Sequence, residues 1–371
     1  MVKKRALVFT TIQGHKSISD TLVQILQRQD WEVHSTMYVD PVLVIYRWIY
    51  RHAPALCKYY YFTLFLPGVE HIVRFYTKRT HDAAFRKTMR EYPESDLLIS
   101  ASYGYDSLIT EWKKRMTKEG KKSPAYINAV VDPRTFFPVD LSNTADRNLV
   151  FDNTIARSCR KLKPKAPVAV TGWFVRPQFR SQTPKQEARQ ALGLDANKLT
   201  LLFVAGSEGE TKSARLIPAL LDQNTPTQII LACGSNVKLK AEFDELAASI
   251  PAGSAVTLHT LPFTKEIHKY MHAADLIVGK AGPNMIFEAV ASETPFFATT
   301  HISGQEDGNL ELIREYGIGY VEENLEKAAS LLQEIAAHPQ QLEQFTPHLK
   351  ALAAQNDQAP ARFMDVVHAL T

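Results

Sequence analysis

Residues 275–289 read DLIVGKAGPNMIFEA, and this stretch decides the fold. The apolar run at 275–279 predicts a buried strand, Gly282-Pro283 predicts a turn, and the residues after it predict a helix. A strand that leads directly into a helix is the repeating unit of a parallel sheet covered by helices. The first N–H groups of such a helix point outward at the positive end of its dipole, so the turn is suited to a diphosphate.

Glu288 lies about one turn into the predicted helix. Its carboxylate can accept hydrogen bonds from ribose hydroxyls, as an acidic residue does in other nucleotide-binding folds. The alternative is an ordinary strand–turn–helix joint with a glutamate on the surface.

The same rhythm extends over the second half of the chain. Further strands are predicted at 199–205, 228–233, 255–260 and 295–299, and residues 325–371 have helical spacing. Two polar loops follow strands in this half. Residues 203–210 (FVAGSEGE) offer a second set of N–H groups for phosphates, and residues 303–309 (SGQEDGN) offer side chains suited to sugar hydroxyls. Taken singly, each is also compatible with an ordinary solvated loop.

The first half is predicted to be a separate α/β domain. Its strands are predicted at 5–11, 31–37, 96–101, 125–131, 148–151 and 167–171, with a helix over 16–29. The polar stretch 173–198 is predicted to contain the linker in its early part. We therefore expect an N-terminal domain at 1–173, a second domain at 174–345, and a helical segment at 346–371 that packs back toward the first. Ligands of such open sheets bind outside the carboxyl ends of the strands.

Composition excludes several classes of protein. The chain has 371 residues, a formal net charge of +4, 45% hydrophobic residues and 22% charged residues, as in an ordinary globular enzyme. Cys57, Cys159 and Cys233 show neither CxxC nor Cys/His spacing, which argues against zinc and disulfides and favours a reducing compartment. The apolar run after MVKKR is short and lacks a small-residue cleavage site, so it is interpreted as a strand. Because every apolar run is shorter than the roughly 20 residues that span a bilayer, no transmembrane helix is expected.

Residues 42–90 combine basic and aromatic side chains. Nine Lys or Arg residues face only two acids, Glu70 and Asp82, among many Tyr, Trp and Phe residues. This mixture suits an anionic membrane surface, where rings enter the interface and cations meet head groups. The alternative is a helical hairpin whose rings pack inside the domain. Binding to nucleic acid is not expected, since the motifs of the second half have no role in it.

Several motifs follow one another in an order that a known enzyme family shares. They are AGSEGE (205–210), CGSN (233–236), LPFTKEI (261–267), HAADLIVGKAGP (272–283) and SGQEDGN (303–309). This order resembles the monogalactosyldiacylglycerol synthase and processive diacylglycerol glucosyltransferase family, which is related to the enzyme that adds N-acetylglucosamine to form lipid II. GWFVRPQF at 172–179 resembles the family's interdomain segment. The resemblance implies the GT-B glycosyltransferase fold, in which two Rossmann-like domains face each other across a cleft, and a UDP-sugar donor.

The resemblance also implies roles for individual residues of the donor site. Glu288 would hold the ribose, and the diphosphate would lie at Gly282, Pro283 and Asn284. Gly206 and Ser207 would lie beside the phosphates, and Phe263 and Thr264 would line the uracil pocket. Gln305, Glu306 and Asn309 would face the sugar or its phosphate. Arg176 would be a basic group near the donor cleft.

In the first domain the resemblance points to a general base. Gly14-His15 occupies the place of a GGGH-like motif, although Ile12-Gln13 replaces two of its glycines. A histidine titrates near neutrality and suits the removal of a proton from an acceptor hydroxyl. Asp132, in AVVDP, either orients this base, acts as the base itself, or is simply an Asp-Pro turn residue.

The implied reaction is the inverting transfer of a hexose from a UDP-sugar to a membrane lipid such as diacylglycerol. It needs no DxD-like cluster, no metal and no cofactor beyond the donor. The enzyme is expected at the inner face of the cell membrane as a peripheral protein. Three alternatives stay open: an N-acetylglucosamine transferase with a polyisoprenoid-linked or soluble acceptor, a non-catalytic UDP-sugar-binding subunit, and a UDP-sugar epimerase.

Overall fold

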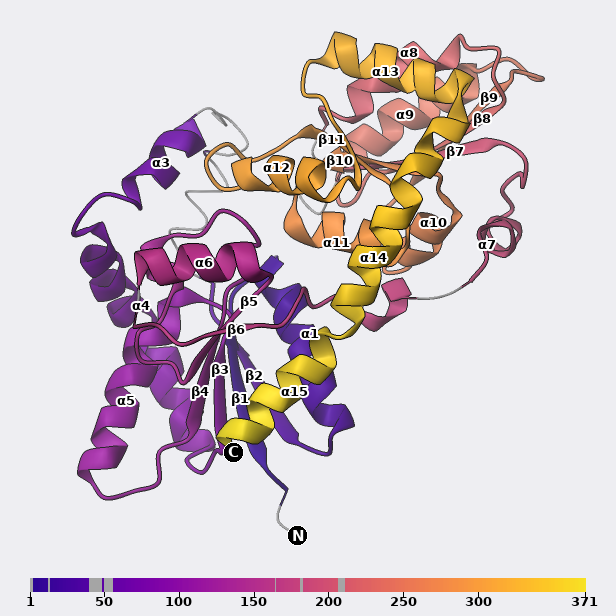
Figure 1. Ribbon diagram of the computed structural model, residues 1–371. Coiled ribbons are helices and arrows are strands. Elements are labelled where there is room, and N and C mark those ends of the chain that lie inside the picture. Colours follow the sequence, from indigo (N-terminus) through magenta and orange to yellow (C-terminus); the bar gives the residue numbers. More distant parts are fainter. Residues whose placement is uncertain are drawn as a thin grey trace. The chain divides into compact units, whose positions relative to one another are not determined.

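The computed structural model describes residues 3–12, 14–39, 49, 56–163, 165–180, 183–205 and 211–371 (Figure 1). The chain forms two compact units. Unit 1 comprises residues 1–176, 302–308 and 355–371, and unit 2 comprises residues 177–301 and 309–354. The segment predicted as one helical piece at 346–371 is thus divided at residue 354.

Unit 1 is built on a parallel sheet of six strands in the order β2-β1-β3-β4-β5-β6. Ala6, Leu7, Val8 and Phe9 of β1 are completely buried, as expected for a central strand covered on both faces. The strands are β1 (Arg5–Thr10), β2 (Glu32–Met37), β3 (Leu97–Ser100), β4 (Ala125–Ala129), β5 (Arg147–Val150) and β6 (Val168–Val170).

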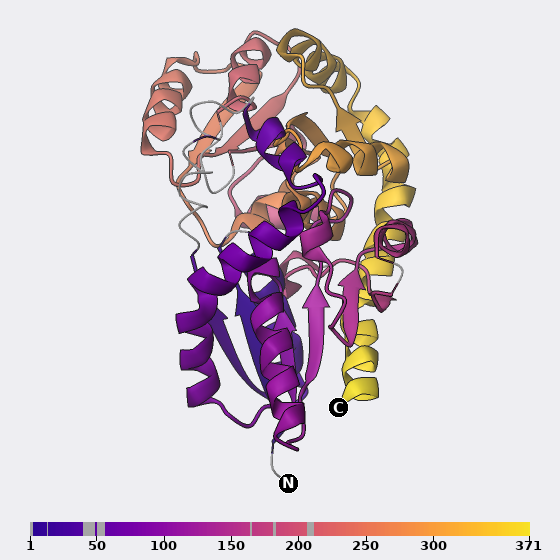
Figure 2. The same cartoon turned by 90° about the vertical axis from the view of Figure 1, so that its left-hand side faces the viewer.

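Helices cover this sheet. α1 packs on β1 and β2 and also contacts α15, while α4 and α5 lie side by side in front of the sheet in Figure 2. α1 buries Ile18, Leu22 and Ile25 at helical spacing. The helices of unit 1 are α1 (Gly14–Arg28), α3 (Cys57–Thr63), α4 (Val69–Glu91), α5 (Asp106–Lys118), α6 (Asn153–Leu162) and α15 (Ala359–Leu370).

Unit 2 has a second parallel sheet of six strands, in the order β12-β11-β10-β7-β8-β9. Its strands are β7 (Leu199–Val204), β8 (Thr227–Ala232), β9 (Val256–Leu261), β10 (Leu276–Lys280), β11 (Phe296–Thr300) and β12 (Gly319–Val321). Its helices are α7 (Lys185–Ala191), α8 (Pro218–Leu221), α9 (Val237–Ser249), α10 (Ile267–Ala273), α11 (Pro283–Ala291), α12 (Asp307–Tyr316), α13 (Leu325–Ala337) and α14 (Thr346–Asp357), of which α12 and α14 extend across the limits of the unit.

The predicted α/β class is confirmed, and every predicted strand is present with small differences at its ends. β12 and α7 are two of the elements for which no range was predicted. β12 has only three half-buried residues, too few to show a periodicity. α7 falls inside the stretch 173–198 that was predicted to contain the linker.

Each sheet contains a point where the chain reverses its direction of progress. In unit 1 the chain passes from β1 to β2 and then returns to the other side of β1 as β3. In unit 2 it passes from β7 through β8 to β9 and then returns to the other side of β7 as β10. Ligands of open α/β sheets bind at such switch points, beyond the carboxyl ends of the strands.

Candidate active-site elements of the two units

The turn between β10 and α11 lies at the switch point of unit 2. A Cβ at Gly279 would come within 3.1 Å of the carbonyl oxygen of Val204, so glycine permits the close approach of β10 to β7. Gly282 caps α11 with an extended backbone, and Pro283 is the first helical residue, where its missing N–H is no loss. Asn284 follows Pro283. The predicted strand–turn–helix therefore forms, with the amino end of α11 at the carboxyl edge of the sheet.

Asn309 braces this turn from α12. Its Nδ2 donates to the carbonyl oxygen of Ala281 over 2.9 Å, and the Ala281 N–H donates to the carbonyl oxygen of Thr300 over 2.8 Å. The side chain of Asn309 is 1% exposed. The resemblance implies that Asn309 faces the sugar or its phosphate, and in the structure its Nδ2 is bound to the peptide that precedes the turn.

Glu288 is buried, with 6% of its surface exposed. The alternative of a surface glutamate therefore does not apply. Removing a carboxylate from water is costly unless partners compensate, so a buried glutamate at this edge is a stronger sign of a binding role than an exposed one.

The loop after β9, also at the carboxyl edge of this sheet, carries two more of the predicted donor residues. Phe263, between β9 and α10, is 63% exposed, unlike the phenylalanines of the core. The Thr264 hydroxyl accepts a hydrogen bond from the Glu266 N–H over 3.0 Å. Gly206 and Ser207 lie outside the described residues.

Residues 302–308 belong to unit 1, although β11 before them is in unit 2. The buried carboxylate of Glu306 accepts from the Ile302 N–H over 2.7 Å and thereby closes its own loop. Gln305 Oε1 accepts from the hydroxyl of Tyr61 over 2.5 Å. Glu306 therefore holds the loop together, while Gln305 is the predicted sugar ligand with a side-chain partner on α3.

His15 lies at the switch point of unit 1. Its Nδ1 is 2.7 Å from the carbonyl oxygen of Ala101, which follows β3. Since a carbonyl can only accept, Nδ1 carries the proton in the neutral ring, and Nε2 keeps its lone pair. Burial lowers the pKa of His15, and the Ala101 carbonyl opposes this less strongly. His15 is thus a neutral imidazole with Nε2 as its basic atom near pH 7.

Ala101 was missed by sequence reasoning. It acts through its backbone, and only the strand order brings the end of β3 beside the end of β1.

The other predicted residues of unit 1 are Asp132 and Arg176. Asp132 is half-buried and follows β4, two strands away from β1 in the sheet. Two residues later, Arg134 forms an ion pair of 2.8 Å with Asp152, and both side chains are nearly buried. Arg176 is half-buried at the end of unit 1, directly before Pro177.

Seven large apolar side chains are exposed on and beside α3 and α4, and we call them the α3–α4 apolar face. They are Leu56, Tyr59, Phe62, Phe65, Leu66, Ile72 and Phe75. Lys58 and Arg79 are exposed on the same helices. Tyr61 and Phe85, two other rings of the segment 42–90, are buried. Some rings of this segment are therefore exposed, as expected for a membrane surface, and others pack inside the domain, as in the alternative interpretation. Tyr46, Trp48, Tyr50, Arg47 and Arg51 lie outside the described residues.

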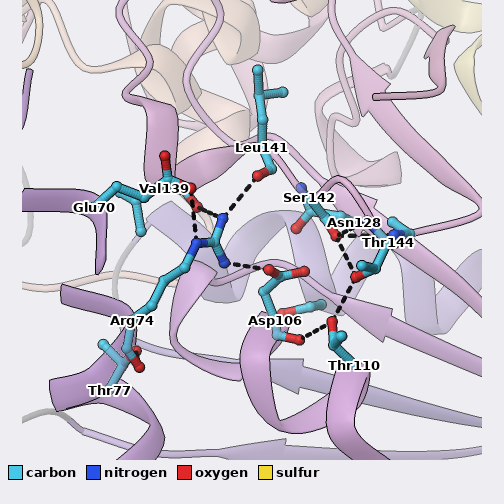
Figure 3. Close-up of polar contacts among 12 residues, drawn as sticks. Glu70, Arg74, Thr77, Asp106, Thr110, Asn128, Val139, Leu141, Ser142 and Thr144 are labelled. Atoms are coloured by element: carbon cyan, nitrogen blue, oxygen red, sulfur yellow. Dashed lines mark hydrogen bonds and ion pairs between the residues drawn. The ribbon is translucent and has the colours of Figure 1, made fainter. Parts of the chain in front are cut away.

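Arg74 was also predicted to meet head groups, and the structure places it elsewhere. Its guanidinium bonds to Glu70 over 2.9 Å, to Asp106, and to the carbonyl oxygen of Leu141 over 2.9 Å (Figure 3). Lys163 also binds Glu70, over 2.5 Å. This cluster fastens α4 to the beginning of α5.

No helix within the described part of the chain is both long and apolar enough to cross a bilayer. Across the same residues, no group of three or more His, Cys, Asp and Glu side chains is placed to hold a metal ion.

The two parallel six-stranded sheets, one in each unit, have the architecture of the GT-B fold. MurG of Acinetobacter baumannii superimposes with a TM-score of 0.62 at 14% identity, covering 99% of this chain and all of that one. Residues 200–358 match the glycosyltransferase family 28 C-terminal domain. Together with the relatives described next, this match confirms the resemblance stated from the motifs, and the chain is a glycosyltransferase.

Two curated relatives resemble a larger part of the chain. The processive diacylglycerol β-glucosyltransferase of Bacillus pumilus is 25% identical over 94% of this chain and 91% of that protein. The chloroplastic monogalactosyldiacylglycerol synthase of Spinacia oleracea is 30% identical over 80% of this chain. The chain spans only 56% of the length of the plant protein.

Proposed function

We propose that the chain transfers a hexose from a UDP-sugar to the hydroxyl of a diacylglycerol-type lipid, with inversion at the anomeric carbon. The observation that carries the proposal is the turn from β10 into α11, with Glu288 buried in that helix, inside a domain of glycosyltransferase family 28. The names of the bacterial and plant relatives support the acceptor class.

The donor site is assigned as follows. Glu288 binds the ribose hydroxyls, and the backbone at Gly282, Pro283 and Asn284 meets the diphosphate. Exposed Phe263 and neighbouring Thr264 border the uracil. Gly206 and Ser207 are assigned to the phosphates, and Gln305 is assigned to the sugar. Arg176 supplies a positive charge for the donor.

Glu306 and Asn309 act as positioning residues in this proposal. Their side chains hold backbone groups at Ile302 and Ala281, so each shapes a loop that meets the donor. No direct contact of either side chain with the sugar is required.

The chemistry needs one base and a stabilised leaving group. The acceptor oxygen attacks the anomeric carbon, and Nε2 of His15 takes the hydroxyl proton. The bond from that carbon to the phosphate oxygen breaks, and UDP leaves with the electron pair. The positive end of α11 stabilises the charge that develops on the diphosphate. Asp132 is retained as a candidate for orienting the base or replacing it.

The acceptor is proposed to come from an anionic membrane surface. Complete burial of one Phe or Ile side chain is worth about 1.5–3 kcal/mol, and each nearby Lys or Arg about 1 kcal/mol. The α3–α4 apolar face with Lys58 and Arg79 therefore suffices for reversible docking. On this proposal the enzyme is a peripheral protein at the inner face of the cell membrane.

The test is mass spectrometry of lipid products after incubation with vesicles that contain diacylglycerol. UDP-glucose, UDP-galactose and UDP-N-acetylglucosamine are supplied separately. We expect a hexosyl-diacylglycerol with one of the first two donors. Transfer only to a soluble or polyisoprenoid-linked acceptor contradicts the lipid assignment, and interconversion of UDP-sugars without acceptor indicates an epimerase. If folded protein yields no product with any donor, the non-catalytic alternative is favoured.

A further inference from the structure

We propose that residues 101–106 are a positioning segment that holds His15 in its reactive tautomer, and that α4 fixes this segment at two points. The inference rests on the proposed function, because it takes His15 as the base. It adds Gly104, His81, Arg74 and Asp106 to the residues that determine the rate of transfer.

The first contact is between the segment and the base. The Ala101 carbonyl accepts the proton of His15 Nδ1 over 2.7 Å. The Ala101 N–H donates to the carbonyl oxygen of Phe9 over 3.0 Å, which ties this peptide to the end of β1. The Ser100 hydroxyl donates to the carbonyl oxygen of Ser102 over 2.6 Å. The carbonyl that selects the tautomer is therefore held from both sides.

The second contact joins the segment to α4 at Gly104. A Cβ on Gly104 would come within 2.5 Å of Nε2 of His81. His81 is 2% exposed, and its ring lies 4.4 Å from that of Tyr38 and 5.0 Å from that of Tyr105, between centroids. Because the ring is packed on these sides, it cannot yield to a methyl group at low cost. Glycine is required for the segment to lie this close to α4.

The third contact joins the same helix to the end of the segment. Arg74 binds the carboxylate of Asp106, the first residue of α5, as Figure 3 shows. The other carboxylate oxygen of Asp106 accepts from the hydroxyl of Tyr126 over 3.1 Å. Loss of either partner leaves a nearly buried charge poorly compensated.

α4 therefore has two faces with different tasks. Ile72 and Phe75 are 67% and 71% exposed and belong to the apolar face, whereas Arg74 and His81 point into the unit and hold residues 104 and 106. The geometry of the base consequently depends on the packing of the helix that carries part of the docking surface.

The experiment combines ¹⁵N NMR of the His15 ring with steady-state transfer kinetics in the full chain. In the wild type we expect a protonated Nδ1 and an unprotonated Nε2. Gly104→Ala should mix the two tautomers and lower kcat about 10- to 100-fold, since small misplacements of a catalytic group have effects of that size. KM for the UDP-sugar should not change, because neither Gly104 nor His81 is among the residues assigned to the donor. His81→Ala in the Gly104→Ala background removes the clash and should restore part of kcat.

Arg74→Gln should act in the same direction as Gly104→Ala. Arg86→Gln is its matched control, because Arg86 forms an exposed ion pair with Asp82 on the same helix and should leave the His15 spectrum and kcat unchanged. If Gly104→Ala does not fold, Ser100→Ala tests the segment without adding an atom.

A folded Gly104→Ala or Ser100→Ala protein with the wild-type tautomer and wild-type kcat would overturn the inference. His15→Ala, measured in parallel, separates this result from failure of the proposed function. If His15→Ala is inactive while the segment variants behave as wild type, only the inference falls. If His15→Ala keeps full activity, the assignment of His15 as the base is wrong, and the inference that rests on it is contradicted as well.

Discussion

The side chain of Asn309 and the backbone of Ala281 are joined by a hydrogen bond of 2.9 Å from Nδ2 to the carbonyl oxygen. This bond connects the first turn of α12 to the peptide that precedes the α11 turn. It fixes the orientation of the amide group, because a carbonyl oxygen requires Nδ2 and excludes Oδ1. The shape of the donor turn thus depends on a residue that follows it in the sequence after one helix, α11, and one strand, β11.

Replacement of Asn309 by Ala should therefore affect both stability and donor binding. Leaving a buried carbonyl without its donor costs about 1–3 kcal/mol of unfolding free energy. We expect a fall of that size in urea denaturation, with weaker UDP binding in calorimetry.

Asn324→Ala is the matched control for this experiment. Asn324 caps α13 through a bond of 3.1 Å to the Lys327 N–H, so its loss should cost about 1 kcal/mol and leave UDP binding unchanged. UDP affinity in Asn309→Ala equal to that of the wild type would contradict the bracing role.

The pH dependence of transfer should follow the titration of His15. Only the neutral ring can accept the proton, so kcat should rise as pH increases through the pKa of His15 and then reach a plateau. Because burial lowers that pKa, the rise should occur below pH 6.5.

His15→Gln should lower kcat by about 10²- to 10⁴-fold and remove the acidic limb of the profile. His368→Gln, at an exposed position on α15, is the control and should preserve both. An acidic limb that survives in His15→Gln would assign the base to another group, with Asp132 as the first candidate.

Docking to vesicles should depend on the α3–α4 apolar face. Ile72→Asp and Phe75→Asp each remove an exposed apolar side chain and add a negative charge. Loss of about 1.5–3 kcal/mol corresponds to a decrease of roughly 10-fold or more in partitioning. The measurement is flotation with vesicles that contain anionic lipid, at low and at high salt.

Val237→Asp supplies the comparison, since Val237 is 79% exposed on α9 of unit 2. This variant should float like the wild type. Equal flotation of all three variants would exclude the apolar face as the docking surface.

The sequence was sufficient for most strands because central strands of parallel sheets are continuous apolar runs. The run of β1, for example, is recognisable without any knowledge of its neighbours. β12 could not be found in the same way, because its three residues are half-buried and precede no recognisable turn pattern.

The candidate site was predictable where a residue's own position in a strand–turn–helix unit defines its task. His15 and Glu288 are of this kind, since each lies on a helix that directly follows a strand. Ala101, Arg74 and Asn309 are of another kind. Their tasks depend on a partner that strand order or another helix brings close. The local sequence contains no pattern that identifies the carbonyl of Ala101 or the acceptors around Arg74.

The central claim is that unit 2 holds a uridine nucleotide with Glu288 on its ribose. Isothermal titration of the full chain with UDP and with 2′-deoxy-UDP tests it most directly. For the wild type we predict measurable heat with UDP and weaker binding of the deoxy nucleotide. Glu288→Gln should lose about 1.5–3 kcal/mol of UDP affinity, roughly 10- to 100-fold, and should no longer distinguish the two nucleotides. Glu311→Gln, an exposed glutamate of α12, should behave as the wild type. The absence of heat with UDP, or equal affinities in the wild type and Glu288→Gln, would contradict the account.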